Sequence, residues 1–194
     1  DSTHNGSFSL TDLRWLPNMT GMTPADENEC RQMLYTGFQM TTPAAVRYPR
    51  GTGPGVEVRK EMSAVPIGKG EIRRRGSAIA ILAFGSLLKP ALEAAEEIGA
   101  TVANMRFVKP LDEQLVLDLA DSHGLLVTVE ENVAMGGAGS AVLEALQRAR
   151  RGVPVLQLGL PDRFIDQGDP GIQLAHAGLN KEGILKSILA RREG

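Results

Sequence analysis

Cysteine is almost absent from this sequence of 194 residues, in which Cys30 stands alone. A lone cysteine can neither close a disulfide within the chain nor build a cysteine-cluster metal site, and such a composition is typical of a reducing compartment. We predict that Cys30 lies on the buried side of a helix. Aromatic residues are also scarce, at 4% of the chain, so stacking platforms for nucleic-acid bases are not expected.

The numbers of basic and acidic residues are nearly equal. The 21 basic and 23 acidic residues leave a formal net charge of -2, which gives no electrostatic footprint for nucleic acid or an anionic membrane. The longest basic run, residues 73–75, is typical of a solvated edge, and no apolar run approaches the length of a membrane span. We therefore expect no nucleic-acid partner, no membrane partner and a cytoplasmic location.

The beginning of the sequence lacks several features of a complete chain. It has no initiator methionine, no signal segment and no arginine-rich transit pattern, and it starts on a polar loop. We therefore expect the chain to be part of a longer polypeptide. With 42% hydrophobic residues it can still bury a core, and its length is typical of one complete domain plus part of another.

Residues 1–55 alternate short helices and strands, which predicts part of an α/β domain. The expected helices cover residues 9–16 and 24–35, and the expected strands cover residues 19–22 and 45–48. Thr23 is the expected cap of the second helix, and Pro24 is its expected first residue, because these residue types are favoured at those positions.

Residues 56–76 are rich in glycine, proline and charge, which is typical of a linker between domains. Within this linker, a short hairpin is expected to pair residues 65–67 with residues 71–72.

Residues 77–194 have a regular pattern. Apolar runs of strand length alternate with helical segments, which predicts a complete doubly wound, mostly parallel sheet. The expected strands cover residues 78–83, 101–104, 125–130 and 155–160, and the expected helices cover residues 88–98, 110–122, 138–150 and 181–192, the last with Asn180 as its cap. The predicted fold class is therefore α/β, with a partial domain followed by a complete one.

Two residues of the first part are candidates for ligand binding. Arg50 follows the strand expected over residues 45–48, and ligands of α/β folds bind at the carboxyl ends of strands. Its planar fork of donors suits a phosphate or a carboxylate. His4 is a titratable group on a loop of small residues. The alternative, in which Arg50 is a solvated loop residue and His4 belongs to a frayed terminus, stays open at this point.

A second group of polar residues closes a strand of the complete domain. Glu130, Glu131 and Asn132 end this strand, and Gly136 and Gly137 lead into a helix. A glycine-rich turn before a helix can cradle an anion, but the spacing here is neither a P-loop nor a dinucleotide fingerprint. Close packing of the helix on the sheet is the favoured interpretation. The carboxylates alternatively form an interface or contact backbone amides.

The remaining candidates are interpreted as structural. The stretch of residues 162–169 is predicted to be an acidic loop, but its acidic residues lack the spacing of a calcium loop. His123 stands near a helix end, where its charge favours the helix dipole, and His176 is expected in a loop. No Ser-His-Asp or Cys-His arrangement stands out.

Several motifs, which occur in the family's order, resemble the 1-deoxy-D-xylulose-5-phosphate synthase family of transketolase-like enzymes. The motifs similar to that family's pyrimidine-binding domain are residues 3–8 (THNGSF), 13–19 (LRWLPNM), 23–29 (TPADENE) and 45–51 (AVRYPRG). The motifs similar to its transketolase C-terminal domain are residues 83–86 (AFGS), 106–112 (RFVKPLD), 129–132 (VEEN), 136–140 (GGAGS) and 159–162 (GLPD). The resemblance covers essentially the whole chain.

This resemblance implies a thiamine-diphosphate transferase. Enzymes of the family decarboxylate pyruvate and join its two-carbon unit to glyceraldehyde 3-phosphate, which gives 1-deoxy-D-xylulose 5-phosphate and carbon dioxide. His4 matches the family's histidine that assists proton transfer on substrate oxygens, and Arg50 matches the arginine that holds the aldehyde's phosphate. Asp1 is the candidate substrate-binding aspartate, although it stands one residue closer to His4 than in the family's Asp-Gly-x-Thr-His pattern.

The same resemblance implies that parts of the enzyme are not in this sequence. The family's diphosphate-binding domain, with its Gly-Asp-Gly magnesium motif, is not present, nor is the glutamate that contacts the cofactor. We therefore expect thiamine diphosphate and Mg²⁺ in a homodimeric full-length parent, and an inactive chain that binds neither by itself.

Rival interpretations are a transketolase, a 2-oxoacid dehydrogenase β subunit, or a non-catalytic interaction or ligand-sensing module. The pattern of residues 48–50 and that of residues 26–29 favour the synthase.

Overall fold

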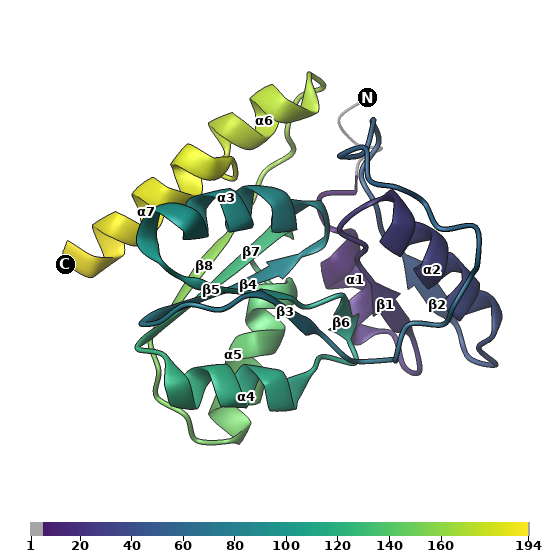
Figure 1. Ribbon diagram of the computed structural model, residues 1–194, viewed down its shortest axis with the longest axis horizontal. Helices are drawn as coiled ribbons and strands as arrows, with labels where there is room; N and C mark the ends of the chain where they lie inside the picture. The colour runs from purple at the N-terminus through teal and green to yellow at the C-terminus, as the bar shows by residue number, and fades with distance from the viewer. Residues whose placement is uncertain (1–5, 194) are drawn as a thin grey trace.

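The computed structural model describes residues 6–193, and apolar runs form the centre of the larger of its two sheets (Figure 1). The central strands β4 (Ile79–Phe84) and β7 (Leu125–Val133) are parallel neighbours. Strands β5 (Thr101–Asn104) and β8 (Val155–Leu160) run parallel outside them, and β3 (Glu71–Arg74) is antiparallel at one edge. Every residue of β4 is buried, which explains its continuous apolar sequence. The predicted doubly wound, mostly parallel α/β sheet is confirmed.

Helices cover both faces of this sheet (Figure 1). Helices α3 (Leu88–Ile98) and α7 (Lys181–Glu193) lie on one face, and α4 (Glu113–Ser122) and α5 (Ala138–Arg148) lie on the other. The predicted cap of α7 is confirmed, because Asn180 Oδ1 accepts a hydrogen bond of 2.9 Å from the backbone N–H three residues later.

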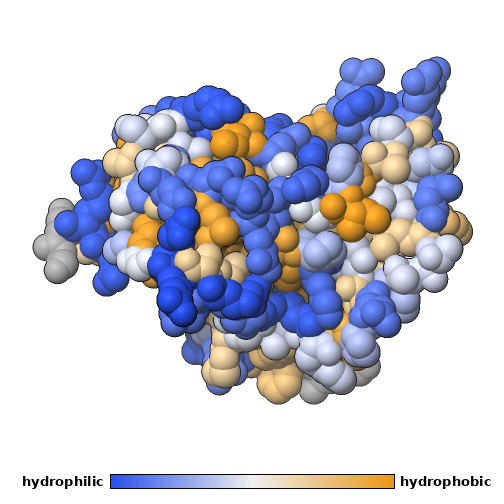
Figure 2. Space-filling model, turned by 90° about the horizontal axis from the view of Figure 1, so that it is seen from below, coloured by the Kyte–Doolittle hydropathy of each residue, from blue (hydrophilic) through white to orange (hydrophobic). Residues whose placement is uncertain are grey.

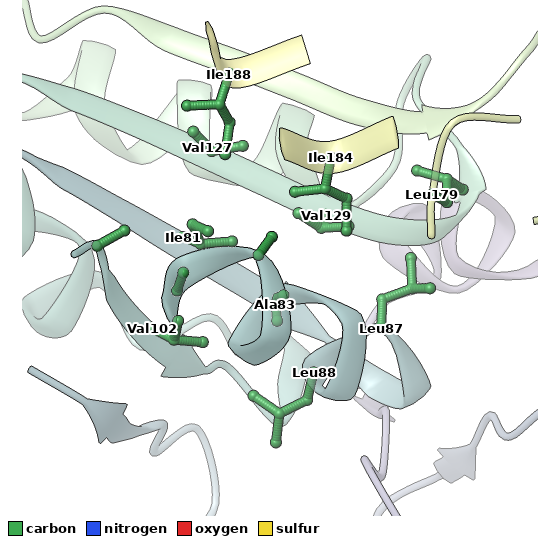
Figure 3. Packing of buried hydrophobic residues seen from close by; sticks show 14 of the residues in the cluster. Ile81, Ala83, Leu87, Leu88, Val102, Val127, Val129, Leu179, Ile184 and Ile188 are labelled. Atoms are coloured by element: carbon green, nitrogen blue, oxygen red, sulfur yellow. The ribbon is translucent and has the colours of Figure 1, made fainter. Parts of the chain in front are cut away.

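The two faces of β7 contact different helices. Val127 and Val129 belong to the hydrophobic cluster under α3 and α7, whereas Leu126 belongs to the cluster under α4 and α5. Figure 3 shows Ile184 and Ile188 of α7 lying over Val127 and Val129. The strand is therefore buried on both sides, as expected for a central parallel strand.

The N-terminal part begins with α1 (Ser9–Trp15), close to the predicted helix. Helix α2 (Glu27–Phe38) begins later than predicted, because Asp26 rather than Thr23 caps it by accepting a hydrogen bond of 2.8 Å from the N–H of Glu29. The predicted start was wrong because the hydroxyl group of Thr23, which would cap the helix, donates instead to the carbonyl oxygen of Arg106, at 3.2 Å.

The smaller sheet combines distant parts of the sequence. Strand β1 (Thr20–Met22) pairs in parallel with β2 (Ala44–Val46) and antiparallel with β6 (Phe107–Lys109). Phe107 is buried with Met22 and with Met33 of α2. The sequence pattern did not predict β6, because three residues are too few to show a period and its partner is remote in the sequence.

Residues 56–66 form no helix or strand, and α2 holds their backbone. Four side chains of α2 accept hydrogen bonds from backbone N–H groups of this stretch and of the glycine before it: Glu27 from Gly55 at 2.8 Å, Asn28 from Arg59 at 3.0 Å, Gln32 from Ser63 at 2.6 Å and Thr36 from Val65 at 2.8 Å. Backbone donors that lose water need such partners. The predicted hairpin of residues 65–67 with residues 71–72 is wrong, because β3 pairs with β5 instead.

One further helix lies outside the predicted pattern. Helix α6 (Pro170–His176) follows Asp169, whose side chain accepts a hydrogen bond of 3.0 Å from the N–H of Ile172. Asp followed by Pro is a favoured helix start, so the sequence did contain a signal for it.

The face seen in Figure 2 is mostly polar. Hydrophilic residues cover much of this side of the molecule, and hydrophobic residues show between them in separate groups. No helix within residues 6–193 is long and apolar enough to cross a membrane.

The buried carboxylate of Glu29 joins the two sheets. It accepts hydrogen bonds from the N–H of Ala25 at 2.7 Å, from Asn104 Nδ2 at 3.0 Å and from Arg106 Nε at 2.7 Å. Arg106 also forms an ion pair of 2.8 Å with Glu71. Helix α2 is thereby fixed to β5 and to the turn before β6.

We expect Glu29→Gln to lower the free energy of unfolding by about 2 kcal/mol, because an amide N–H₂ would face groups that are all donors. Urea denaturation measures this loss. The matched control is Glu113→Gln, which breaks an exposed ion pair with Arg148 and should cost less than about 0.5 kcal/mol. Equal losses in the two variants would contradict the role given to Glu29.

Candidate functional site

A cleft of about 1290 Å³ opens between α2, the loop that follows β2, and the starts of α3 and α6. In Figure 1, α2 lies on the right of the molecule, and α3 and α6 lie farther to the left. Apolar side chains, among them Leu34, Phe38 and Leu174, line much of it, and a few polar side chains share the same space. Apolar walls with a small number of polar groups are typical of a site for a small molecule.

Arg50 lies in this cleft, after the end of a strand, as the sequence predicted. Strand β2 ends at Val46, and the chain then enters the cleft through Tyr48, Pro49 and Arg50. Arg50 is exposed, and its side chain forms no hydrogen bond or ion pair with any residue from 6 to 193. Its five N–H donors are therefore available to an anion.

The carboxylates of the cleft differ from Arg50 because the chain already engages them. Asp26 and Asp169 cap α2 and α6, Glu27 accepts a hydrogen bond from Gly55, and Glu131 accepts one from Ser86. Lys89, which also lines the cleft, resembles Arg50, since no partner for it occurs in the described part of the chain. Among the charged side chains that line the cleft, Arg50 and Lys89 are thus the two without a partner in residues 6–193, and both offer N–H donors to an anionic ligand.

Two predicted site residues, Asp1 and His4, lie outside the described residues. The segment that follows them is described. The N–H of Val133, at the end of β7, donates a hydrogen bond of 2.7 Å to the carbonyl oxygen of Ser7. A Cβ atom on Gly6 would lie 3.7 Å from Arg47 Nε. The chain therefore passes beside the strand end that precedes Arg50.

Sequence reasoning missed the residue that anchors this region, Arg47. Its Nη2 donates a hydrogen bond of 2.7 Å to the carbonyl oxygen of Glu131, and its Nη1 lies 3.4 Å from Glu131 Oε2. The same Oε2 accepts a hydrogen bond of 3.0 Å from Ser86 Oγ. The sequence signal was weak, because an arginine at a strand end does not reveal its partner in another part of the chain.

Glu130 contacts backbone amides, which is one of the alternatives the sequence left open. Its two carboxylate oxygens accept hydrogen bonds of 2.7 Å from Ala138 N and 2.8 Å from Gly139 N, at the start of α5. Burial raises the pKa of Glu130 to about 7, and the two amides and the charges of Arg14 and Arg47 oppose this rise only in part. The amides that an anion would use are thus occupied by Glu130.

The glycines before and within α5 permit close packing, as predicted. A Cβ atom on Gly137 would lie 2.2 Å from Glu130 Oε2, and one on Gly139 would lie 2.6 Å from Thr128 Oγ1. Side chains at these positions would force the helix away from the sheet.

Two other predictions concern single residues. His123 is structural, since its Nε2 lies 2.8 Å from Thr101 Oγ1 and its Nδ1 lies 3.0 Å from the carbonyl oxygen of Leu119. Cys30 was predicted to be buried, and this is wrong: it is partly exposed, because its side of α2 faces the cleft. The described residues contain no group of three or more His, Cys, Asp or Glu side chains that could hold a metal ion.

Comparisons with known proteins agree with this architecture. A family model described as the transketolase C-terminal domain matches residues 68–184. The chain is 69% identical over 189 residues to the 1-deoxy-D-xylulose-5-phosphate synthase of Nitrosospira multiformis and 62% identical over 192 residues to that of Chromobacterium violaceum. These alignments cover 97% and 99% of this chain, which spans 31% of the length of each relative.

Among solved structures, a protein described as "Split gene transketolase, inactive beta4 tetramer" matches with a TM-score of 0.87 and 29% sequence identity. The match covers 97% of this chain and 62% of that one. Both parts of the present fold, and not only the larger sheet, therefore occur together in that structure.

Glu130 should make stability depend on pH. Its pKa in the folded chain, about 7, lies above its ordinary value of 4.5. The stability that protonated Glu130 contributes is therefore complete below about pH 4.5 and is lost as the pH rises through 7. The free energy of unfolding falls by about 3 kcal/mol over this range. In Glu130→Gln, which cannot ionise, the fall in unfolding free energy between pH 5 and pH 8 should be smaller by about that amount.

Urea denaturation at several pH values measures this profile. Glu96→Gln is the matched control, since Glu96 is an exposed glutamate of α3 without a partner in the described chain. It should keep the profile of the unmodified chain. A Glu130→Gln variant with that same profile would show that Glu130 stays ionised in the folded protein.

Proposed function

This chain belongs to the transketolase C-terminal domain family, and we propose that it is the C-terminal portion of a 1-deoxy-D-xylulose-5-phosphate synthase. In this proposal residues 1–55 are the end of the pyrimidine-binding domain, residues 56–76 are the connection, and residues 77–194 are the transketolase C-terminal domain. The family match over residues 68–184 supports the assignment of the C-terminal part to that domain. Relatives at 62% and 69% identity carry the synthase name, so transketolase and the 2-oxoacid dehydrogenase β subunit are not favoured.

The proposed reaction condenses pyruvate with glyceraldehyde 3-phosphate and releases carbon dioxide, which gives 1-deoxy-D-xylulose 5-phosphate for isoprenoid, thiamine and pyridoxal synthesis. The observation that carries this proposal is the unpaired Arg50 in a cleft whose carboxylates are already engaged. We assign the aldehyde's phosphate to Arg50, because a guanidinium binds a phosphate with two parallel hydrogen bonds. His4 would move a proton on a substrate oxygen, and Asp1 would contact the substrate.

Thiamine diphosphate and Mg²⁺ belong to the proposal for the full-length protein. The cofactor would supply the nucleophilic carbon for the condensation. We assign both groups to the part of the full-length protein outside this sequence, because the chain spans only 31% of the length of the Nitrosospira multiformis relative. We further propose that the full-length protein is a homodimer in the cytoplasm, where a lone cysteine stays reduced.

A chimeric enzyme tests the proposed function. The upstream part of the Nitrosospira multiformis synthase is joined to this chain in place of its own C-terminal 31%, and formation of 1-deoxy-D-xylulose 5-phosphate is measured with thiamine diphosphate and Mg²⁺. We expect an active chimera, because the replaced segments are 69% identical. This chain alone, under the same conditions, should form no product. A correctly folded but inactive chimera would contradict the proposal.

In the active chimera, Arg50→Ala should raise the KM for glyceraldehyde 3-phosphate and leave the KM for pyruvate nearly unchanged, because only the aldehyde carries a phosphate. The loss in kcat/KM should be about 2 to 4 kcal/mol, the value of a charge-assisted contact with two hydrogen bonds. Arg50→Lys should recover part of it, since it keeps the charge but loses the fork.

The control for charge alone is Arg75→Ala, which removes an exposed arginine outside the cleft. It should leave both KM values unchanged. His4→Ala provides the contrast, because loss of a proton-transfer group should lower kcat more than it weakens aldehyde binding. If Arg50→Ala weakened both substrates equally, the phosphate assignment would be wrong.

A further inference from the structure

The larger sheet has the crevice in which doubly wound domains bind their ligands. From β4 the chain continues through α3 to β5 on one side and then crosses through α4 to β7 on the other, so the strand order reverses between β4 and β7. Ligands of such folds bind outside the carboxyl ends of the strands at this point. Here the pairing of β4 with β7 ends at Phe84 and Glu130, which are register partners.

The chain's own N-terminal part fills this crevice. Directly after β4, a Cβ atom on Gly85 would lie 3.6 Å from the carbonyl oxygen of Pro24. On the side of β7, Arg47 binds Glu131, and the carbonyl oxygen of Ser7 accepts the N–H of Val133. A ligand of the complete domain would have to displace these contacts.

Glu131 holds the strand end that carries Arg50. Its contacts with Arg47 are charge-assisted, and the side chains of Arg47 and Glu131 are only 16% and 19% exposed. Ser86, in the short 3-10 helix (Gly85–Leu87) that follows β4, holds the same carboxylate from the opposite side of the crevice. Arg47 is three residues from Arg50, so its position limits where the loop with Arg50 can lie.

Asn132 holds the segment that follows His4. Helix α1 starts after Phe8, which provides no side-chain cap for the first N–H groups of the helix. Asn132 supplies this cap from a remote part of the chain: its Oδ1 accepts a hydrogen bond of 3.0 Å from Leu10 N, and its Nδ2 donates one of 3.0 Å to Thr11 Oγ1. Asn132 is fully buried.

We propose that Glu131 and Asn132 are positioning residues, through which the switch-point crevice holds the two substrate-binding segments instead of a ligand of its own. Glu131 acts through Arg47 on Arg50, and Asn132 acts through α1 on the segment that precedes α1 in the sequence. The kinetic consequence of this inference rests on the proposed function. The contacts of Glu131 and Asn132 do not, because they are observed in this chain.

A double-mutant cycle in the active chimera tests the kinetic consequence. Glu131→Ala should raise the KM for glyceraldehyde 3-phosphate roughly tenfold and change the KM for pyruvate little, and Glu131→Gln, which keeps a hydrogen-bond acceptor for Ser86, should show a smaller rise. In an Arg50→Ala background, Glu131→Ala should have almost no further effect on the aldehyde, because its action passes through Arg50. Additive effects of the two changes would overturn the proposal.

The matched control is Glu144→Ala. Glu144 forms an ion pair of 2.6 Å with Arg14 and so also joins the N-terminal part to the complete domain, but it does not touch the segment of Arg50. It should leave the aldehyde KM unchanged. An equal rise in both variants would mean that any contact between the two parts has this effect.

Amide hydrogen exchange on the unmodified chain and its variants tests the contacts without any activity. Glu131→Ala should speed exchange at least tenfold at the N–H of Arg47, which donates a hydrogen bond of 2.8 Å to the carbonyl oxygen of Met22, and Asn132→Ala should do so at Leu10, while β4 stays protected. Unchanged exchange at these places would overturn the positioning role even if the chimera is active. Faster exchange in an inactive chimera would support the contacts and contradict only the proposed function.

Discussion

A polar group that loses water on folding must find a hydrogen-bond partner, and the carboxyl end of β7 meets this demand in three directions. Glu130 binds the first amides of α5, Glu131 binds Arg47 and Ser86, and Asn132 caps α1. Successive residues of a strand point to opposite sides of the sheet. One short strand end can therefore fix a helix of its own domain and two segments of the N-terminal part together.

The same demand explains how a long stretch without secondary structure keeps a fixed path. Backbone N–H groups of residues 56–66 donate hydrogen bonds to side chains of α2, among them Asn28 and Gln32. Helix α2 is itself fixed to the larger sheet through Glu29. Strand β6 adds a backbone connection, since it leaves the complete domain to pair with β1. These contacts unite the N-terminal part with the complete domain, although the sequence pattern changes between them.

The sequence predicted those features that depend on local patterns. The four parallel strands follow from apolar runs, and the start of α7 follows from Asn180, whose partner is three residues away. Strand β6, the true cap of α2 and the cap that Asn132 gives to α1 depend on partners remote in the sequence, which no local pattern shows. In the candidate site, the position of Arg50 followed from a strand end, whereas the roles of Arg47 and Glu131 appear only when both are placed in space.

The complete domain has the topology of a ligand-binding fold but uses both of its usual anion sites for the protein itself. The amides at the start of α5 bind Glu130, and the crevice between β4 and β7 contains Arg47 and the segment around Ser7. This explains why the glycines near α5 do not follow a phosphate-binding fingerprint: they permit the helix to approach Glu130 and Thr128 closely. Arg50 and Lys89, which have no partner in the described residues, lie outside the domain's own crevice, in the cleft beside α2. In the proposed function, ligand binding and support are therefore divided between the two parts: the N-terminal part presents Arg50, and the complete domain fixes the strand that precedes it.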